Sequence, residues 1–152
     1  MYYSKDTLVF LNGNWMKASE AVTDLFSQTL HYGNGVFEGI RAYDTPAGPQ
    51  IFKAMEHFER LRHSAKRLHI KLKYSPEELT ILAYELLQKN NLKNAYIRPL
   101  VFMGANMSLT LTDEVNILLT AWEWERYLGD NLLKVMVSSY QRPNPKSIPV
   151  DE

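Results

Sequence analysis

Two consecutive helical patterns between strand-like segments constrain this 152-residue chain more than any other feature. Apolar residues within 55–69 recur at intervals of three or four, which predicts an amphipathic helix. A second helix begins at Ser75–Glu78, where an N-cap serine, a proline at the first helical position and a capping-box glutamate stand in order. Its apolar stripe runs to Asn90. The chain therefore contains a helix pair, not regularly alternating strands and helices.

Strand-like patterns surround this pair. The opening residues predict two short strands joined by an Asn12-Gly13 turn. Further strands are predicted over 36–43, 50–53, 95–103, 115–124 and 132–140. Strands, two helices and strands again indicate an α+β fold, with a mixed, largely antiparallel sheet and the two consecutive helices packed on it. The sequence has no glycine-rich phosphate loop at a strand-to-helix junction.

Composition and charge narrow the class of protein. Lys plus Arg and Asp plus Glu number 17 each, which argues against a protein dominated by nucleic acid. The segment 53–73 is basic, with seven Lys or Arg against two Glu, and a solvated helix face explains this more simply than a nucleic-acid surface. No apolar run approaches the roughly 20 residues of a membrane span. We therefore expect a cytoplasmic protein with neither a nucleic-acid nor a membrane partner.

Metal and thiol chemistry have little support. The sequence contains no cysteine, which excludes thiolate nucleophiles and Cys-based zinc sites. His57, His63 and His69 are spaced so that each step turns about 240° around a helix, and they cannot converge on one ion. We expect no metal site.

Arginine and aromatic residues share faces on several strands. A period of two places Tyr96, Arg98, Leu100 and Phe102 on one face of 95–103. The same period groups Phe37 and Gly39 with Arg41 and Tyr43, and the glycine suggests a close approach of backbone or ligand. Trp122, Trp124 and Tyr127 add further rings. These residues could line a pocket for a small carboxylate, form an ordinary core, or leave Arg98 in solvent.

Five segments together resemble a known family. They are LHYGNGVFEGIRAYD (30–44), HFERLRHSAKRL (57–68), NAYIRPLVFMG (94–104), WEWERYLG (122–129) and VSSYQRPNPKSIP (137–149). In this order they resemble the branched-chain-amino-acid aminotransferases, which are fold-type-IV pyridoxal-phosphate enzymes. The family moves an amino group between leucine, isoleucine or valine and 2-oxoglutarate.

The resemblance implies a two-domain enzyme. Residues 1–130 would form the N-terminal small α+β domain, and 131–152 a strand and interdomain connector leading to a C-terminal domain. The lysine that carries pyridoxal 5'-phosphate in the family would follow Glu152, and Lys146 matches no functional position. We therefore expect residues 1–152 alone to be catalytically incomplete and not to retain the cofactor.

Individual roles follow from the matched motifs. Arg60 resembles the arginine that binds the cofactor phosphate, and a guanidinium offers paired donors to phosphate oxygens. Arg98, with Tyr96 beside it, resembles the residue that binds the side-chain carboxylate of glutamate. The walls of the side-chain pocket are implied to be Phe37, Gly39, Trp124 and Tyr127. Tyr32 matches a tyrosine that reaches the partner subunit's pocket, which implies a homodimer.

One segment departs from the family pattern. Residues 104–113 lack the glycine-rich loop that usually helps to bind the substrate carboxylate, so the exact substrate stays open. D-amino-acid aminotransferases and aminodeoxychorismate lyases share the fold and are alternatives, but they generally lack the VFEGIR and AYIRPL motifs. An alternative from another functional class is a non-enzymatic ligand-binding domain that uses the same half of the fold.

Overall fold

The computed structural model describes residues 3–110, 112–124, 132–141 and 143–144. Its elements in chain order are β1 (Leu8–Leu11), β2 (Asn14–Lys17), α1 (Gln28–Tyr32), β3 (Gly35–Phe37), β4 (Ile40–Tyr43), β5 (Gln50–Ile51), α2 (Ala54–Arg67), α3 (Pro76–Lys89), β6 (Ala95–Met103) and β7 (Val115–Glu123). The predicted helix pair between strands is confirmed.

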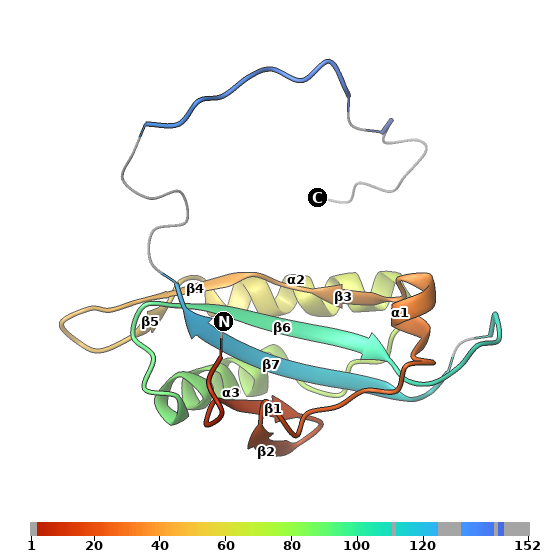
Figure 1. Ribbon diagram of the computed structural model, residues 1–152, viewed down its shortest axis with the longest axis horizontal. Helices are drawn as coiled ribbons and strands as arrows, with labels where there is room; N and C mark the ends of the chain where they lie inside the picture. Colours follow the sequence, from red (N-terminus) through yellow and green to blue (C-terminus); the bar gives the residue numbers. More distant parts are fainter. Residues whose placement is uncertain (1–2, 111, 125–131, 142, 145–152) are drawn as a thin grey trace.

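The described strands form one seven-stranded sheet with the order β2-β1-β7-β6-β4-β5, and β3 pairs with β6 in line with β4. Every pairing among them is antiparallel. The long strands β6 and β7 form the centre (Figure 1). Asn12 and Gly13 both have positive φ between β1 and β2, as a tight Asn-Gly hairpin requires. The predicted α+β class is therefore confirmed.

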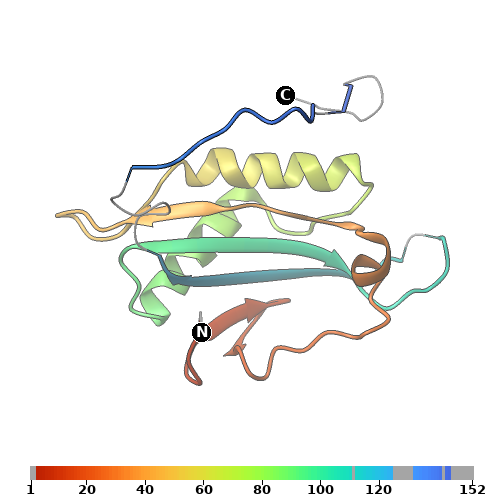
Figure 2. The same cartoon turned by 45° about the horizontal axis from the view of Figure 1, so that its top comes forward.

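Both long helices cover the same face of the sheet, which leaves the other face open (Figures 1 and 2). The core between helices and sheet consists of apolar side chains, chiefly Ile40, Phe58, Leu61, Ala65, Leu79, Ala83, Leu86, Ile97, Val101 and Leu119. Burial alternates strictly along β6, with the odd-numbered residues buried and the even-numbered ones half-buried. The even-numbered side chains therefore point to the open face.

The strand predicted over 36–43 is divided into β3 and β4 around Glu38 and Gly39. The register does not change there, because Phe37 pairs with Leu100 and Ile40 with Ile97. The Glu38 N–H donates to the Pro99 carbonyl at 3.1 Å, but proline has no N–H to donate in return. The missing donor of Pro99 therefore explains the interruption.

Two predicted strands differ from the structure. The strand expected over 50–53 ends at Ile51, because Lys53 takes a left-handed conformation with φ 48° before α2. Residues 132–141 form no strand, and Leu132, Val135 and Val137 are exposed. An isolated extended segment has no hydrogen-bonding neighbour, so its alternating sequence cannot form a strand by itself. The assignment of 131–152 to a connector stays a prediction. No helix in the described part of the chain is long and apolar enough to cross a membrane.

Candidate functional site

Arg98 lies on the open face of the sheet, near the middle of β6. Its guanidinium donates from Nη2 to the Tyr96 hydroxyl at 2.8 Å. It also stacks over the Phe37 ring, 4.3 Å from the centroid, and stands 5.2 Å from the Tyr96 centroid. Its Nε atom is buried and donates to no group among the described residues. A cation held on rings with an unused buried donor is ready to accept an anionic partner.

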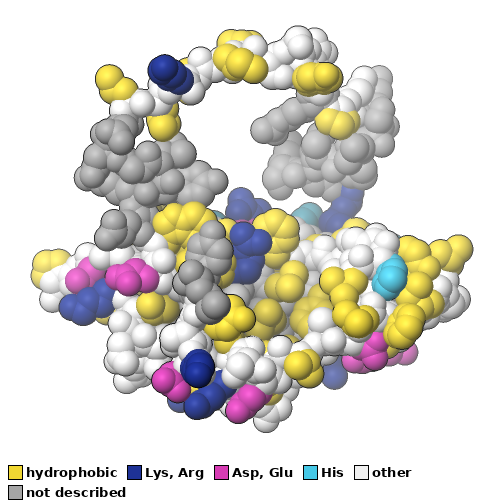
Figure 3. Space-filling view, in the orientation of Figure 1, with side chains coloured by type: hydrophobic (Ala, Val, Ile, Leu, Met, Phe, Trp, Pro, Cys, Tyr) yellow, Lys and Arg dark blue, Asp and Glu magenta, His cyan; other side chains and the backbone are white. Residues whose placement is uncertain are grey.

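Two further aromatic rings pack beside Tyr96. Tyr96 lies 5.0 Å from both Trp122 and Trp124, and the two indoles are 5.8 Å apart. Arg41 donates to the Trp124 carbonyl at 2.6 Å, which ties the end of β7 to β4. Figure 3 shows this face, with Lys and Arg side chains among hydrophobic ones near its middle. The open face therefore combines apolar walls with fixed positive charge.

Gly39 makes room for Tyr96. A Cβ atom at position 39 would collide with the Tyr96 hydroxyl. Because two tryptophans flank the Tyr96 ring, a side chain at Gly39 would move that ring or break its bond to Arg98. A close approach of backbone or ligand was predicted at this glycine, but the group that approaches it in the structure is the Tyr96 side chain of β6.

Two further residues, Tyr32 and Tyr127, were assigned to substrate. Tyr32, in α1, is exposed, and its hydroxyl donates to the Met107 carbonyl at 3.0 Å. Helix α1 lies near the C-terminal end of β6 (Figure 1), whereas Tyr96 is the second residue of that strand. Tyr127 lies outside the described residues. The structure therefore brings together Phe37, Gly39, Tyr96, Arg98 and Trp124, and it leaves Tyr32 at a distance from them.

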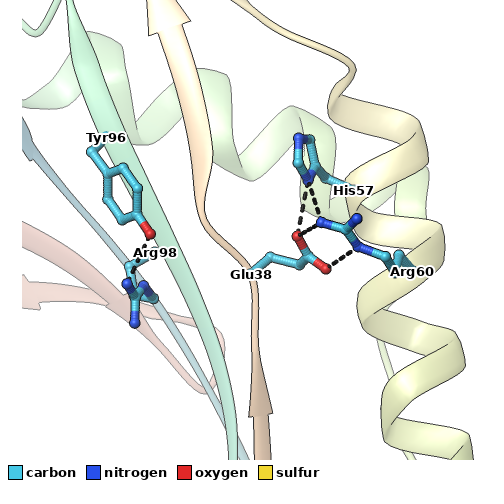
Figure 4. Close-up of polar contacts among 5 residues, drawn as sticks. All are labelled: Glu38, His57, Arg60, Tyr96 and Arg98. Atoms are coloured by element: carbon cyan, nitrogen blue, oxygen red, sulfur yellow. Dashed lines mark hydrogen bonds and ion pairs between the residues drawn. The ribbon is translucent and has the colours of Figure 1, made fainter. Parts of the chain in front are cut away.

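Arg60 belongs to a second polar cluster, on the other side of the β3–β4 segment (Figure 4). Glu38 accepts from Arg60 Nε and Nη2, both at 2.7 Å, and its Oε2 lies 2.9 Å from His57 Nδ1. An ionised carboxylate only accepts hydrogen bonds, so Nδ1 of His57 is the donor. His57 and Arg60 stand three residues apart on one side of α2, where both reach the same carboxylate.

The electrostatics of this cluster favour the charged forms. Burial alone would raise the pKa of the Glu38 carboxyl, but hydrogen bonds from Arg60 and His57, with their charges, hold that pKa below its ordinary value. The hydrogen bond and charge of Glu38 raise the pKa of the Arg60 guanidinium. Glu38 and Arg60 therefore form a persistent ion pair.

The pair is asymmetric in its burial. The Glu38 side chain is 6% exposed, whereas that of Arg60 is 63% exposed. Arg60 Nη1 makes no hydrogen bond to a described residue. This donor edge suits an anion with several oxygens, such as a phosphate.

Glu38 was missed by the site prediction, although a signal for it existed. Period two puts Glu38 on the same face as Val36 and Ile40, which is the core face. A carboxylate there needs a cationic partner, and the basic helix that follows supplies one. His57 was considered only as a metal ligand. The described residues contain no group of three or more His, Asp or Glu that could hold a metal ion.

Comparisons with known proteins identify the family to which this chain belongs. The family described as amino-transferase class IV matches residues 35–151. The branched-chain-amino-acid aminotransferase of Salmonella typhimurium is 40% identical over 158 aligned residues, which cover 98% of this chain and 50% of that relative. The one from Pseudomonas aeruginosa is 39% identical, with 91% of this chain and 47% of the relative covered. The chain thus spans about half the length of the curated relatives it matches.

Solved structures give the same result. A crystal structure of the Escherichia coli branched-chain amino acid aminotransferase superposes with a TM-score of 0.87 at 38% identity, covering 95% of this chain and 50% of that one. The branched-chain aminotransferase of the thermophilic archaeon Thermoproteus uzoniensis, solved with norvaline, superposes at 0.87 with 32% identity, covering 95% and 50%. The resemblance read from the motifs is confirmed, and the chain belongs to the class IV aminotransferase family.

Proposed function

We propose that these residues form the N-terminal half of a pyridoxal-phosphate-dependent aminotransferase that acts on leucine, isoleucine and valine with 2-oxoglutarate. Similarity to branched-chain aminotransferases over nearly the whole chain supports this assignment. The coverage of about half of each relative supports the existence of a second half that completes the enzyme. Following the resemblance, the lysine that binds the cofactor belongs to that second half.

The observation that carries the proposal is the setting of Arg98. Such an enzyme must accept an apolar side chain and a side-chain carboxylate at one place in successive half-reactions. Phe37 and the Trp122–Trp124 pair supply apolar surface, while Arg98 keeps a buried donor that has no partner among the described residues. A carboxylate can pair with that guanidinium, and a branched side chain can lie on the rings instead.

Arg60 is the residue proposed for the cofactor phosphate. The two hydrogens on its Nη1 fit a phosphate group, because they bond to no described residue and the side chain is exposed. When bound, the cofactor supplies the electron sink for amino-group transfer. Arg60 would bind and orient its phosphate, and the aromatic wall would exclude water from the reacting face.

A second copy of the protein is the proposed partner. Apolar residues near Tyr32 are exposed to solvent, among them Val22, Leu25, Phe26 and Leu30. Large exposed apolar patches are typical of interaction surfaces. We assign this region to a homodimer contact, with Tyr32 directed to the partner subunit's pocket, as the family resemblance implies.

The test uses a full-length protein that carries both halves. Arg98→Ala should lower the glutamate half-reaction by about tenfold to more than a hundredfold, since a charge-assisted pair contributes about 1.5–3 kcal/mol. The leucine half-reaction should change little. Single-turnover absorbance measurements resolve the two half-reactions. Arg98→Met is the matched control, because it removes the charge but keeps apolar contact with Phe37. Equal losses with both substrates would make Arg98 a structural residue and contradict the proposal.

A further inference from the structure

Glu38 holds Arg60 in a way that a simple tether between helix and sheet does not need. The carboxylate takes the Nε hydrogen and one Nη2 hydrogen of the guanidinium, both at 2.7 Å. A guanidinium has five N–H donors in a rigid fork. Because Nη2 also lies 3.4 Å from His57 Nδ1, the outer edge keeps chiefly the two hydrogens on Nη1 for a ligand. That outer edge points away from the buried carboxylate.

The burial of the two groups argues that the arginine is presented to a ligand. Glu38 is 6% exposed and Arg60 is 63% exposed, so the anion serves as the anchor and the cation as the exposed end. His57 donates to the same carboxylate at 2.9 Å and fixes its orientation from a second position on α2. An exposed arginine without such a clamp samples many rotamers. Here its outer edge is held in one direction.

From this geometry we infer that Glu38 is a positioning residue for anion binding: it aligns the outer edge of Arg60 toward the phosphate of the cofactor. The inference rests on the proposed function, in which Arg60 binds that phosphate. The benefit to binding is preorganisation: because the rotamers of Arg60 are already restricted, less conformational entropy is lost when the ligand binds. Glu38 itself touches neither cofactor nor substrate.

Simple electrostatics predicts the opposite effect, which makes the inference testable. A carboxylate next to a phosphate site repels the phosphate, so its neutralisation should tighten binding if charge alone matters. If Glu38 aligns Arg60, its neutralisation should weaken binding instead. The sign of the change therefore separates the two explanations.

The experiment measures dissociation constants of pyridoxal phosphate, and of pyridoxal without the phosphate, for the full-length protein by absorbance titration. Glu38→Gln should raise the pyridoxal phosphate constant by roughly three- to thirtyfold, a range set by the rotamer freedom that Arg60 regains. The pyridoxal constant should not change. Glu59→Gln is the matched control, because it removes one negative charge from an exposed residue next to Arg60. It should leave both constants within about twofold of the parent.

Coupling to Arg60 completes the test. In an Arg60→Ala background, Glu38→Gln should add no more than about a twofold change. Arg60→Lys keeps the charge but loses the fork, so it should also weaken phosphate-dependent binding. This variant tests the clamp even if Glu38→Gln folds poorly.

The outcomes separate the inference from the proposed function. Unchanged or tighter binding by Glu38→Gln, or equal weakening in the Arg60→Ala background, overturns the positioning role alone. Parent-like binding by Arg60→Lys does the same. If Arg60→Ala leaves the pyridoxal phosphate constant unchanged, the cofactor role of Arg60 fails and the inference fails with it.

Discussion

At the scale of single residues, two arginines of this chain lie in different environments. Arg98 lies among aromatic rings and is held by a neutral hydroxyl, so its positive charge is not compensated by a described carboxylate. Arg60 forms a bidentate ion pair with Glu38 and keeps only its outer edge for a ligand. The arrangement of Arg98 suits transient binding of a substrate carboxylate. The arrangement of Arg60 suits long-lived binding of a phosphate.

The lowered pKa of Glu38 predicts a pH dependence of stability. The pKa of an unfolded glutamate is about 4.3, and the pKa of the folded Glu38 carboxyl lies below its ordinary value. The unfolded state therefore binds more protons between the two values, so stability falls as the pH drops through this window and is fully present above it. Urea unfolding from pH 7 to pH 3 measures the effect.

The control for this prediction is the Glu38→Gln variant. It should be less stable than the parent at pH 7, and the difference should shrink below about pH 4, where the parent loses the charged form. Glu59→Gln, which removes an exposed carboxylate, should follow the parent curve. A constant difference between parent and Glu38→Gln at every pH would contradict a stabilising ionised Glu38.

At the scale of elements, β6 separates the apolar core from the candidate site. Its odd-numbered side chains are buried under the helices, and its even-numbered ones form the aromatic and cationic open face. A shift of register by one residue would exchange the two faces, so the pairing with β7 over nine residue pairs also sets the site. The same register therefore fixes both the buried core residues and the candidate site residues of β6.

The start of α3 predicts a measurable contribution from local sequence. Ser75 accepts from the Glu78 N–H at 3.2 Å, and the Glu78 side chain accepts from the Ser75 N–H at 2.7 Å. Ser75→Ala removes the first of these and should lower the free energy of unfolding by about 1 kcal/mol. Urea denaturation measures this loss. Ser75→Asp, which keeps an acceptor at the N-cap, should retain most of the stability, whereas equal losses in both variants would contradict a capping role.

At the scale of the whole molecule, the open face is the part that the described residues leave uncovered. Aromatic rings, Arg98 and exposed apolar residues near α1 all lie outside the helix-covered core. The relatives are about twice as long as the matched region. We expect the second half of the protein and a second subunit to cover this surface.

The proposed division of the active site predicts the behaviour of residues 1–152 produced alone. This polypeptide should show no transfer of amino groups from leucine to 2-oxoglutarate, because the cofactor lysine is assigned to the second half. A coupled assay for glutamate formation measures this, with the full-length protein as the positive control. Turnover by residues 1–152 above the background without enzyme would contradict the assignment.

Local patterns in the sequence determined most elements of the fold. The capping box at Ser75, the Asn12-Gly13 turn and the period of two in 95–103 each depend on neighbours within a few residues, so they could be recognised without tertiary contacts. The motifs that contain Arg60 and Arg98 also identified the family. Only the tertiary structure decided how the two arginines are partnered. Glu38 meets Arg60 across 22 residues of chain, and Pro99 interrupts a strand more than 50 residues earlier. Such pairings depend on sheet register and helix docking, which local residue preferences do not specify. The exposed segment 132–141 shows the same limit, because a strand forms only where another strand offers its hydrogen bonds.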